Sequence, residues 1–268
     1  MADTEDVAAH YGRGPVIDVI RQALADAGLP STGLDPELLA PLDHFHTGGR
    51  AATEELLAQL DVGPATSVLD VGAGLGGPAR LLAKHRGCRV TCLDVTPAFC
   101  AAARLLTDMT GLSDRVDVHE GDATAMPFAD RSFDLVWMQN AAMNIADKAQ
   151  LFGEVRRVLR PGGRLALQEI VAGDAGKPAF FPVPWADTAA LSFLAEPQAL
   201  RQTLTHASLV PDTWVDVTDW ALAQPTPVAG AVLGYHVYVH DAAIKQGNSR
   251  RNMREGRCAL LRATATAT

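Results

Sequence analysis

The chain has 268 residues, 48% of them hydrophobic and 20% charged, a composition typical of a soluble globular protein with a full hydrophobic core. Its 31 acidic and 23 basic residues give a formal net charge of -8, which disfavours nucleic acid as a partner. No apolar run approaches the roughly 18 residues that a membrane span requires, so we expect no membrane association.

The first residues, Met1 to Asp6, are acidic and are not followed by an apolar stretch, so we expect neither a secretory signal nor a transit peptide. This favours a cytoplasmic protein whose mature chain begins here. The four cysteines form no Cys-x-x-Cys pair and have no histidines at zinc-finger spacing. We interpret them as reduced core thiols and expect no metal site.

Residues 1–63 are expected to form a mostly helical N-terminal segment. From Val16 to Gly28 the apolar residues recur at helical spacing and the stretch ends at a glycine, which predicts a first helix. Thr47 to Leu60 predicts a second helix, with Thr47 as its N-cap and an end at Gly63.

From residue 64 to residue 268 we expect one domain, which begins with short apolar strands that alternate with helical stretches. The expected strands are Val68–Val71, Arg89–Leu93, Val116–His119, Phe133–Met138 and Arg164–Ile170. The expected helices are Gly76–His85, Pro97–Leu112 and Lys148–Leu159, the last followed by the break Arg160-Pro161-Gly162-Gly163. This alternation predicts a doubly wound α/β fold with a mostly parallel sheet, whose ligand lies at the carboxyl ends of the strands.

Residues 172–209 interrupt the pattern with a Pro-rich, aromatic segment and two short helices, which we interpret as an insertion over the sheet. Beyond the insertion we expect a strand at Thr213–Trp220, a helix from about Val228 to Lys245 and a last strand at Arg257–Thr264.

We assign no function to two features near the end of the chain. The alternating Ala-Thr tail from Ala263 to Thr268 is expected to be frayed. A basic cluster is formed by Arg250, Arg251, Arg254 and Arg257. We interpret it as a solvated turn beside a strand.

The strongest local motif is the apolar strand Val68–Val71 running into the glycine-rich turn that continues to Gly77. Glycines admit positive φ angles and let a ligand approach the backbone closely, and the amides that open the following helix favour an anionic group. The turn also satisfies the Gly-x-Gly-x-x-Gly pattern of dinucleotide-binding enzymes. Taken alone, it leaves both NAD and S-adenosylmethionine as ligands.

Two acids narrow this choice. Asp94 ends the second strand, where a carboxylate can accept hydrogen bonds from both hydroxyls of a ribose, and this fits both ligands. Asp70 lies two residues before Gly72, where it could fix the turn or attract a cationic amino group. A carboxylate at that point would repel the pyrophosphate of NAD.

A third acid, Asp122, follows the third strand. Its side chain could accept a hydrogen bond from an adenine amino group while the amide of Ala123 donates to the ring. Alternatively, Asp122 is a turn carboxylate that caps its own loop.

Together these motifs resemble the class I S-adenosylmethionine-dependent methyltransferases over about residues 64 to 170. The resemblance implies S-adenosylmethionine as cofactor and a seven-stranded sheet whose final strand, Arg257–Thr264, runs antiparallel. The expected cofactor-binding residues are Tyr11, Asp70, Gly72, Gly74, Asp94, Val95, Asp122, Ala123, Met138 and Gln139.

A narrower resemblance rests on Asp43–Gly49, Met143–Ile145 and Pro182–Ala186. These segments are similar to a branch that includes sarcosine and dimethylglycine N-methyltransferases and several natural-product methyltransferases. The branch implies a small acceptor under a lid formed by residues 1–63 and the insertion. The expected substrate residues are Asn144, Trp185 and Tyr235. The acceptor, the methylated atom and the oligomeric state, a homo-oligomer included, stay open.

Methyl transfer from a sulfonium is an in-line displacement whose main requirement is positioning. For a phenol or an enol-like carbon a general base would help, and the candidates are His44, His46 and His236, each of which could instead be structural. Tyr11 could close over the sulfonium or could belong to a disordered N-terminus, and Trp185 could instead be a core residue. We expect Gln139 or Asn140, at the end of the fourth strand, to orient the acceptor.

Two rival functions remain from the sequence. An NAD-dependent oxidoreductase shares the glycine pattern and Asp94, although Asp70 and Asp122 count against it. A non-catalytic S-adenosylmethionine-binding partner subunit would be expected to have lost glycines or Asp94, and neither loss is seen.

Overall fold

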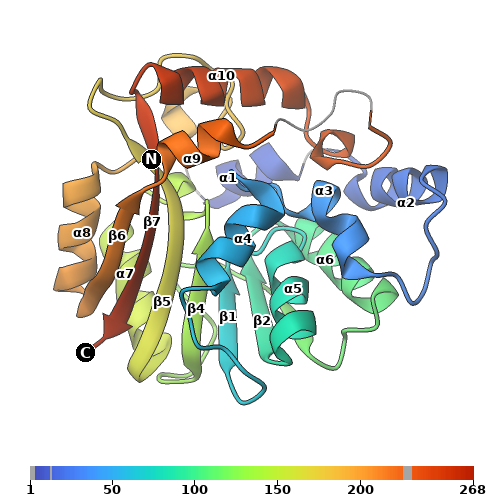
Figure 1. Ribbon diagram of the computed structural model, residues 1–268, viewed down its shortest axis with the longest axis horizontal. Helices are drawn as coiled ribbons and strands as arrows, with labels where there is room; N and C mark the ends of the chain where they lie inside the picture. Colours follow the sequence, from blue (N-terminus) through green and yellow to red (C-terminus); the bar gives the residue numbers. More distant parts are fainter. Residues whose placement is uncertain (1–3, 13, 226–230) are drawn as a thin grey trace.

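A single seven-stranded sheet forms the centre of the molecule (Figure 1), and its strands follow the order β3-β2-β1-β4-β5-β7-β6. The computed structural model describes residues 4–12, 14–225 and 231–268. Strands β1 to β5 pair in parallel, whereas β7 is antiparallel to both β5 and β6. This confirms the predicted sheet. The strands are β1 (Ser67–Val71), β2 (Arg89–Asp94), β3 (Val116–Glu120), β4 (Phe133–Gln139), β5 (Leu159–Ala172), β6 (Leu209–Asp216) and β7 (Cys258–Ala267).

Helices cover both faces of the sheet and the carboxyl ends of its parallel strands. The α-helices are α1 (Thr4–Tyr11), α2 (Val16–Asp26), α3 (Ala40–Asp43), α4 (Gly49–Leu57), α5 (Gly77–Arg86), α6 (Pro97–Met109), α7 (Lys148–Val158), α8 (Pro197–His206), α9 (Thr218–Ala223) and α10 (Ala242–Arg254). Short 3-10 helices are η1 (Pro36–Leu39), η2 (Ala142–Asn144), η3 (Ala189–Leu191) and η4 (Tyr235–Val237). Figure 1 shows α1, α9 and α10 over the end of the sheet at which β1 and β4 finish.

The alternation of side chains along each strand explains how the sheet is buried on both faces. Leu69 and Val71 of β1 pack in one cluster with residues of α7 and α8. Val68 of the same strand packs on the other side, in a cluster with residues of α4 and α5. Successive strand residues point to opposite faces, so one short apolar strand supplies both cores.

The second predicted helix begins later than expected. Gly48 has a φ of 84°, in the left-handed region, and α4 starts at Gly49 without a side-chain cap. A Cβ on Gly48 would lie 2.7 Å from the ring of Trp220, so the backbone passes too close to that ring for a side chain. Thr47 therefore does not cap the helix, and its Oγ1 accepts a hydrogen bond from Nδ2 of Asn140 instead.

The predicted break at residues 160–163 lies inside β5. Leu159 pairs with Phe133, and after a shift of register Arg164 pairs with Leu135, so the extra residues form an irregularity within the strand. Gly162, with a φ of 75°, permits this bend.

The Ala-Thr tail is not frayed. Residues 263–267 form the second half of β7, and Ala263, Ala265 and Ala267 are each 1% exposed. Small side chains fit here because β7 is a central strand that is covered on both sides. The alternation of Ala with Thr follows the period of a strand, and the low complexity of the sequence concealed this pattern.

Three other predictions near the C-terminus need correction. The strand expected at Thr213–Trp220 is β6, which ends at Asp216 and is followed by α9. The start of the helix expected from Val228 lies outside the described residues, and the helix found in this region, α10, begins only at Ala242. The arginines at 250, 251 and 254 lie on α10 and not in a turn.

No helix in the described part of the chain is long and apolar enough to cross a membrane. The four cysteines are free and buried. Burial raises the pKa of the Cys88 thiol to about 11 and that of Cys258 to about 12, so both are protonated at neutral pH.

We predict that two neighbouring substitutions in β7 differ strongly in their effect on stability. Ala265→Lys places a cation in the core and should lower the free energy of unfolding by at least about 3 kcal/mol. Thr266→Lys should change it by less than about 1 kcal/mol. The residue is half-buried, and its hydroxyl lies 3.0 Å from Oδ2 of Asp212, so a lysine here can pair with that carboxylate. Urea denaturation followed by circular dichroism measures both, and equal stabilities would contradict the central position of β7.

Candidate active site

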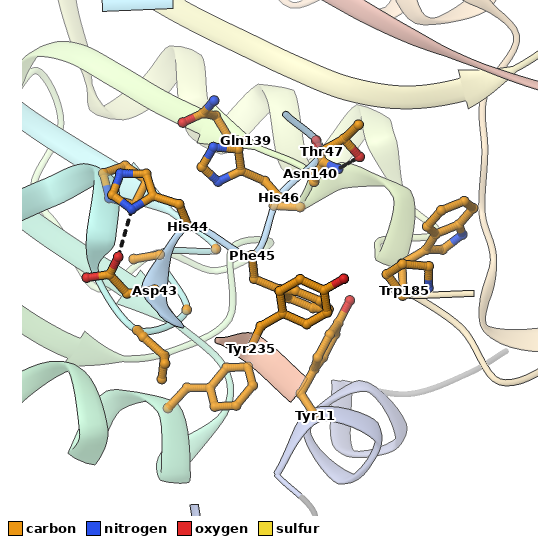
Figure 2. Close-up of a pocket in the computed structure, with 18 of the residues that line it drawn as sticks. Tyr11, Asp43, His44, Phe45, His46, Thr47, Gln139, Asn140, Trp185 and Tyr235 are labelled. Atoms are coloured by element: carbon orange, nitrogen blue, oxygen red, sulfur yellow. Dashed lines mark hydrogen bonds and ion pairs between the residues drawn. The ribbon is translucent and has the colours of Figure 1, made fainter. Parts of the chain in front are cut away.

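A cavity of about 1100 Å³ opens at the carboxyl ends of β1, β2 and β4 (Figure 2). Its wall combines the glycine turn with the N-terminal segment, the insertion and α10. Pockets for one drug-sized ligand span roughly 300–1,000 Å³. The cavity therefore has room for a cofactor together with a second molecule.

Every residue that the sequence predicted for the site lines this cavity except Met138. Met138 is fully buried and packs in the core cluster with Leu69 and Val71. Its position on β4 directs the side chain into the sheet core, whereas the next residue, Gln139, reaches the cavity. Met138 therefore does not line the cavity, and its role in cofactor binding stays a prediction.

The glycine turn is shaped by close contacts of its backbone. Gly72 has a φ of 72°, and a Cβ added to it would collide with the Cβ of Ala141. The amides of Gly72 and Ala73 both donate to the carbonyl oxygen of Leu93, at 2.8 and 3.2 Å. A side chain at position 72 would separate the ends of β1 and β4.

Asp94 connects three loops at this edge of the sheet. Its Oδ2 accepts from the amide of Gly74 and its Oδ1 from the amide of Thr96, both at 2.8 Å. Its main-chain carbonyl accepts from the amide of Gly121 at 3.0 Å. A carboxylate has about four acceptor positions, so these two side-chain bonds leave capacity for the hydroxyls of a ribose.

Asp70 is buried in the cavity wall and accepts no hydrogen bond from the described residues. Burial, and next the charge of Asp94, raise the pKa of Asp70 to about 8. Such a carboxyl is costly to keep without a partner. A ligand that brings a cationic amino group to Asp70 would supply this partner.

Asp122 has the role of a turn carboxylate. Its Oδ1 accepts from the amide and the hydroxyl of Thr124, at 2.7 and 2.8 Å. Asp122 and Ala123 also line the cavity, so this capping bond is compatible with a further contact to an adenine.

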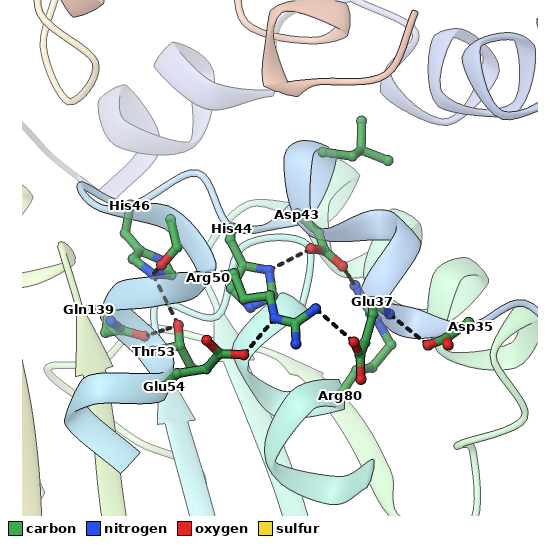
Figure 3. Close-up of polar contacts among 12 residues, drawn as sticks. Asp35, Glu37, Asp43, His44, His46, Arg50, Thr53, Glu54, Arg80 and Gln139 are labelled. Atoms are coloured by element: carbon green, nitrogen blue, oxygen red, sulfur yellow. Dashed lines mark hydrogen bonds and ion pairs between the residues drawn. The ribbon is translucent and has the colours of Figure 1, made fainter. Parts of the chain in front are cut away.

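A buried ion cluster lies beside the cavity (Figure 3). Asp43 accepts from Nδ1 of His44 at 2.7 Å and from Nη2 of Arg80 at 2.6 Å, and all three side chains are at most 3% exposed. Burial raises the pKa of Asp43, but His44 and Arg80 outweigh it and hold that pKa below its usual value. The cluster joins α3 to α5 and fixes the loop that carries the two histidines.

The three candidate histidines differ in their hydrogen bonds and in their exposure. Nε2 of His44 is covered by protein and has no hydrogen-bond partner among the described residues. Nε2 of His46 lies 3.0 Å from the carbonyl oxygen of Gly49, to which it donates. Burial, and next the charge of His44, lower the pKa of His46 to about 3, so His46 is neutral. His236 is exposed at the rim.

The two side-chain amides at the end of β4, those of Gln139 and Asn140, are held differently. Oε1 of Gln139 accepts from Nε1 of Trp137 and from Oγ1 of Thr53, both at 2.9 Å, while its Nε2 has no partner among the described residues. Asn140 has a φ of 54°, a left-handed conformation in which its Nδ2 donates to Thr47. Both side chains are anchored at one end and line the cavity (Figure 2).

Hydrogen bonds across the top of the cavity join the N-terminal helix to the insertion. The hydroxyl of Tyr11 donates to Oδ1 of Asn144 at 2.9 Å, and Nδ2 of Asn144 donates to the carbonyl of Trp185 at 2.6 Å. Tyr235 packs on Phe45 with a ring-centroid distance of 5.0 Å. Asn144 thus connects α1 to the insertion, in addition to lining the cavity.

Sequence reasoning missed four residues of this site. Asp43 and Phe45 flank the candidate base His44 in the chain, and this adjacency could have indicated them. Arg80 lies among apolar residues of α5, where a charged side chain indicates a buried partner. Arg250 was grouped with its basic neighbours, and nothing in the sequence showed that it lines the cavity. In the described part of the chain no group of three His, Cys, Asp or Glu side chains could hold a metal ion.

Residues 69–167 match the family described as methyltransferase domain. With the strand order and glycine turn above, this match shows that the chain belongs to the class I S-adenosylmethionine-dependent methyltransferases, whose cofactor is S-adenosylmethionine.

Curated relatives include N-methyltransferases and other methyltransferases. The glycine/sarcosine/dimethylglycine N-methyltransferase of Actinopolyspora halophila is 31% identical over 180 residues, which is 67% of this chain and 32% of that protein. Methyltransferase GfsG of Streptomyces halstedii is 41% identical over 137 residues, which is 51% of this chain and 48% of that protein. The chain thus matches a third to a half of the length of these relatives.

Solved structures extend the similarity in fold to nearly the whole chain. The geranyl diphosphate C-methyltransferase of Streptomyces coelicolor A3(2) superposes with a TM-score of 0.69 at 19% identity, over 99% of this chain and 97% of that chain. At this identity the comparison supports the fold.

Asp70→Asn should have opposite effects on stability and on binding. The folded pKa of Asp70 is raised, so the wild-type carboxyl stabilises the fold below about pH 4 and loses that contribution as the pH rises toward about 8. The free variant should therefore be more stable at pH 7 by at least about 1 kcal/mol, whereas the Kd for S-adenosylmethionine should rise at least about tenfold. Thermal denaturation and calorimetry measure the two effects, and a destabilised variant with unchanged affinity would refute the role of Asp70.

Proposed function

We propose that this protein transfers the methyl group of S-adenosylmethionine to a small molecule. The observation that carries the proposal is the buried, unbonded carboxyl of Asp70 beside a glycine turn that Asp94 holds open. The size of the cavity supports it, because space for an acceptor remains next to the cofactor.

The residues divide the work of holding the cofactor. Asp94 would accept from the ribose hydroxyls, and Asp70 would pair with the amino group of the methionine part. Asp122 and Ala123 would meet the adenine, and Tyr11 would close the site from α1. The cofactor, when bound, supplies an electrophilic methyl group on a sulfonium.

The chain itself contributes mainly position. Asn140 would orient the acceptor, since its anchored amide lies at the end of β4 beside the glycine turn. The bonds of Tyr11 and Asn144 close the lid and exclude water. Holding two reactants in line can contribute several kcal/mol to catalysis without a charged catalytic group.

Ligand binding distinguishes this proposal from the rival functions. S-adenosylmethionine at about 100 times its Kd should raise the melting temperature by about 5 °C, and NAD should leave it unchanged. Isotope-labelled donor followed by mass spectrometry should then show a labelled product with a small-molecule acceptor.

A shift with NAD alone would support an oxidoreductase. A shift with S-adenosylmethionine but no labelled product from a broad metabolite extract would support the non-catalytic subunit. Sarcosine and dimethylglycine should be tested separately, because they represent the acceptors named for the curated relatives.

His46 is expected to act as a brace. His46→Gln keeps an N–H donor for the carbonyl of Gly49 and should lower kcat less than about tenfold. Since the pKa of His46 is about 3, its titration should not appear in the pH–rate profile between pH 5 and 8. A fall of about 100-fold or more, with an ionisation lost from the profile, would instead make His46 the general base.

A further inference from the structure

Both acidic side chains and two arginines, Arg50 and Arg250, line the cavity. The acids that line it are Asp43, Asp70, Asp94, Asp122 and Asp147. Of these, Asp70 and Asp94 belong to the ends of β1 and β2, which hold the proposed cofactor site. Another part of the wall is formed by α10, which lies above the carboxyl ends of the strands (Figure 1).

One face of α10 lines the cavity. Gln246, Ser249, Arg250 and Met253 are spaced at i, i+3, i+4 and i+7, so they lie along one side of the helix. Arg250 is half-buried within this face.

Arg250 has no carboxylate partner among the described residues. Its Nη1 lies 3.4 Å from the carbonyl oxygens of Ala221 and Gln224, and its Nη2 donates to the carbonyl of Leu222. These are neutral acceptors at the end of α9, and the two 3.4 Å contacts are long for hydrogen bonds. The positive charge is thus oriented but not neutralised.

The other arginine in the wall differs in this respect. Arg50 is paired with Glu37 at 2.8 Å and with Glu54 at 2.7 Å. A cation without a charged partner in a partly enclosed, mainly apolar cavity favours the binding of a ligand that carries a negative charge.

The wall near α10 is otherwise suited to a bulky molecule. Aromatic and apolar side chains line it, namely Phe45, Met143, Trp185, Leu233, Tyr235 and Met253. Burial raises the pKa of Tyr235 to about 12, so this phenol is uncharged at neutral pH.

We propose that the methyl acceptor is a bulky, largely apolar molecule that carries one anionic group, and that Arg250 binds this group. The proposal rests on the methyl-transfer function above. It assigns Arg250 a role in substrate specificity beyond its contacts with α9.

Two fluorescent probes with the same aromatic skeleton test this proposal. 8-Anilino-1-naphthalenesulfonate carries a sulfonate, and N-phenyl-1-naphthylamine lacks it. Each is titrated into the full-length protein saturated with S-adenosylhomocysteine, so that the cofactor end is filled. The wild type should bind the sulfonate probe at least tenfold more tightly than the neutral one.

Arg250→Gln removes the charge and keeps an amide donor for the carbonyls of α9. It should weaken the sulfonate probe at least tenfold and leave the neutral probe within twofold. Arg251→Gln is the matched control, because Arg251 is the next residue, is 58% exposed and pairs with Glu255 outside the cavity. This control should change neither affinity.

Arg250→Lys retains the charge and should keep most of the affinity for the sulfonate probe. This variant separates the loss of the charge from the loss of the arginine side chain. Equal affinity of wild type and Arg250→Gln for that probe would overturn the proposal, as would an equal loss for both probes. S-adenosylmethionine binding, measured separately by thermal shift, should be unchanged in Arg250→Gln. Absence of that shift in the wild type would instead remove the methyl-transfer function.

Discussion

The side chain and carbonyl of Asp94 fix the edge of the sheet on which the site depends. The loops after β1, β2 and β3 each donate one backbone amide to this residue, from Gly74, Thr96 and Gly121. Three loops that are remote in sequence thus acquire one geometry. The cost of burying the carboxylate, which raises its pKa, is offset in part by these bonds. The carboxyl of Asp70 beside it makes no hydrogen bond to the described residues, and this is the group that we propose pairs with the amino group of the cofactor.

Sequence patterns predicted most of what local periodicity determines. The parallel strands, the glycine turn and the acids at the strand ends follow from alternation and spacing along short segments. Contacts between distant segments were not accessible in this way. Asp43 and Arg80 are 37 residues apart, and only the packing of α3 on α5 brings them together. Likewise Gly48 looked like part of a helix, because its contact with Trp220 joins residues that no local pattern relates.

In the proposed function, charged side chains bind the ligands, whereas catalysis depends on how the two reactants are positioned. Asp70 and Asp94 line the cavity at the ends of β1 and β2, where we propose that the cofactor binds. The histidines that seemed suited to proton transfer are instead committed to the protein, His44 to Asp43 and His46 to Gly49. The amide of Asn140 is held in place by Thr47. Arg250 adds a positive charge to another part of the cavity wall. In the proposed function, the cofactor and the acceptor are therefore distinguished by their charges as well as by their shapes.

The antiparallel insertion of β7 between β5 and β6 also constrains the order of folding during synthesis. Strand β6 pairs with β7 and not with β5, so it cannot join the sheet while residues 258–267 are still within the ribosome. Until then the outer edge of β5 is unpaired and open to association with other nascent chains. The cofactor-binding half of the sheet, β1 to β4, has no such dependence. A nascent chain could therefore form the cofactor site before its sheet is complete.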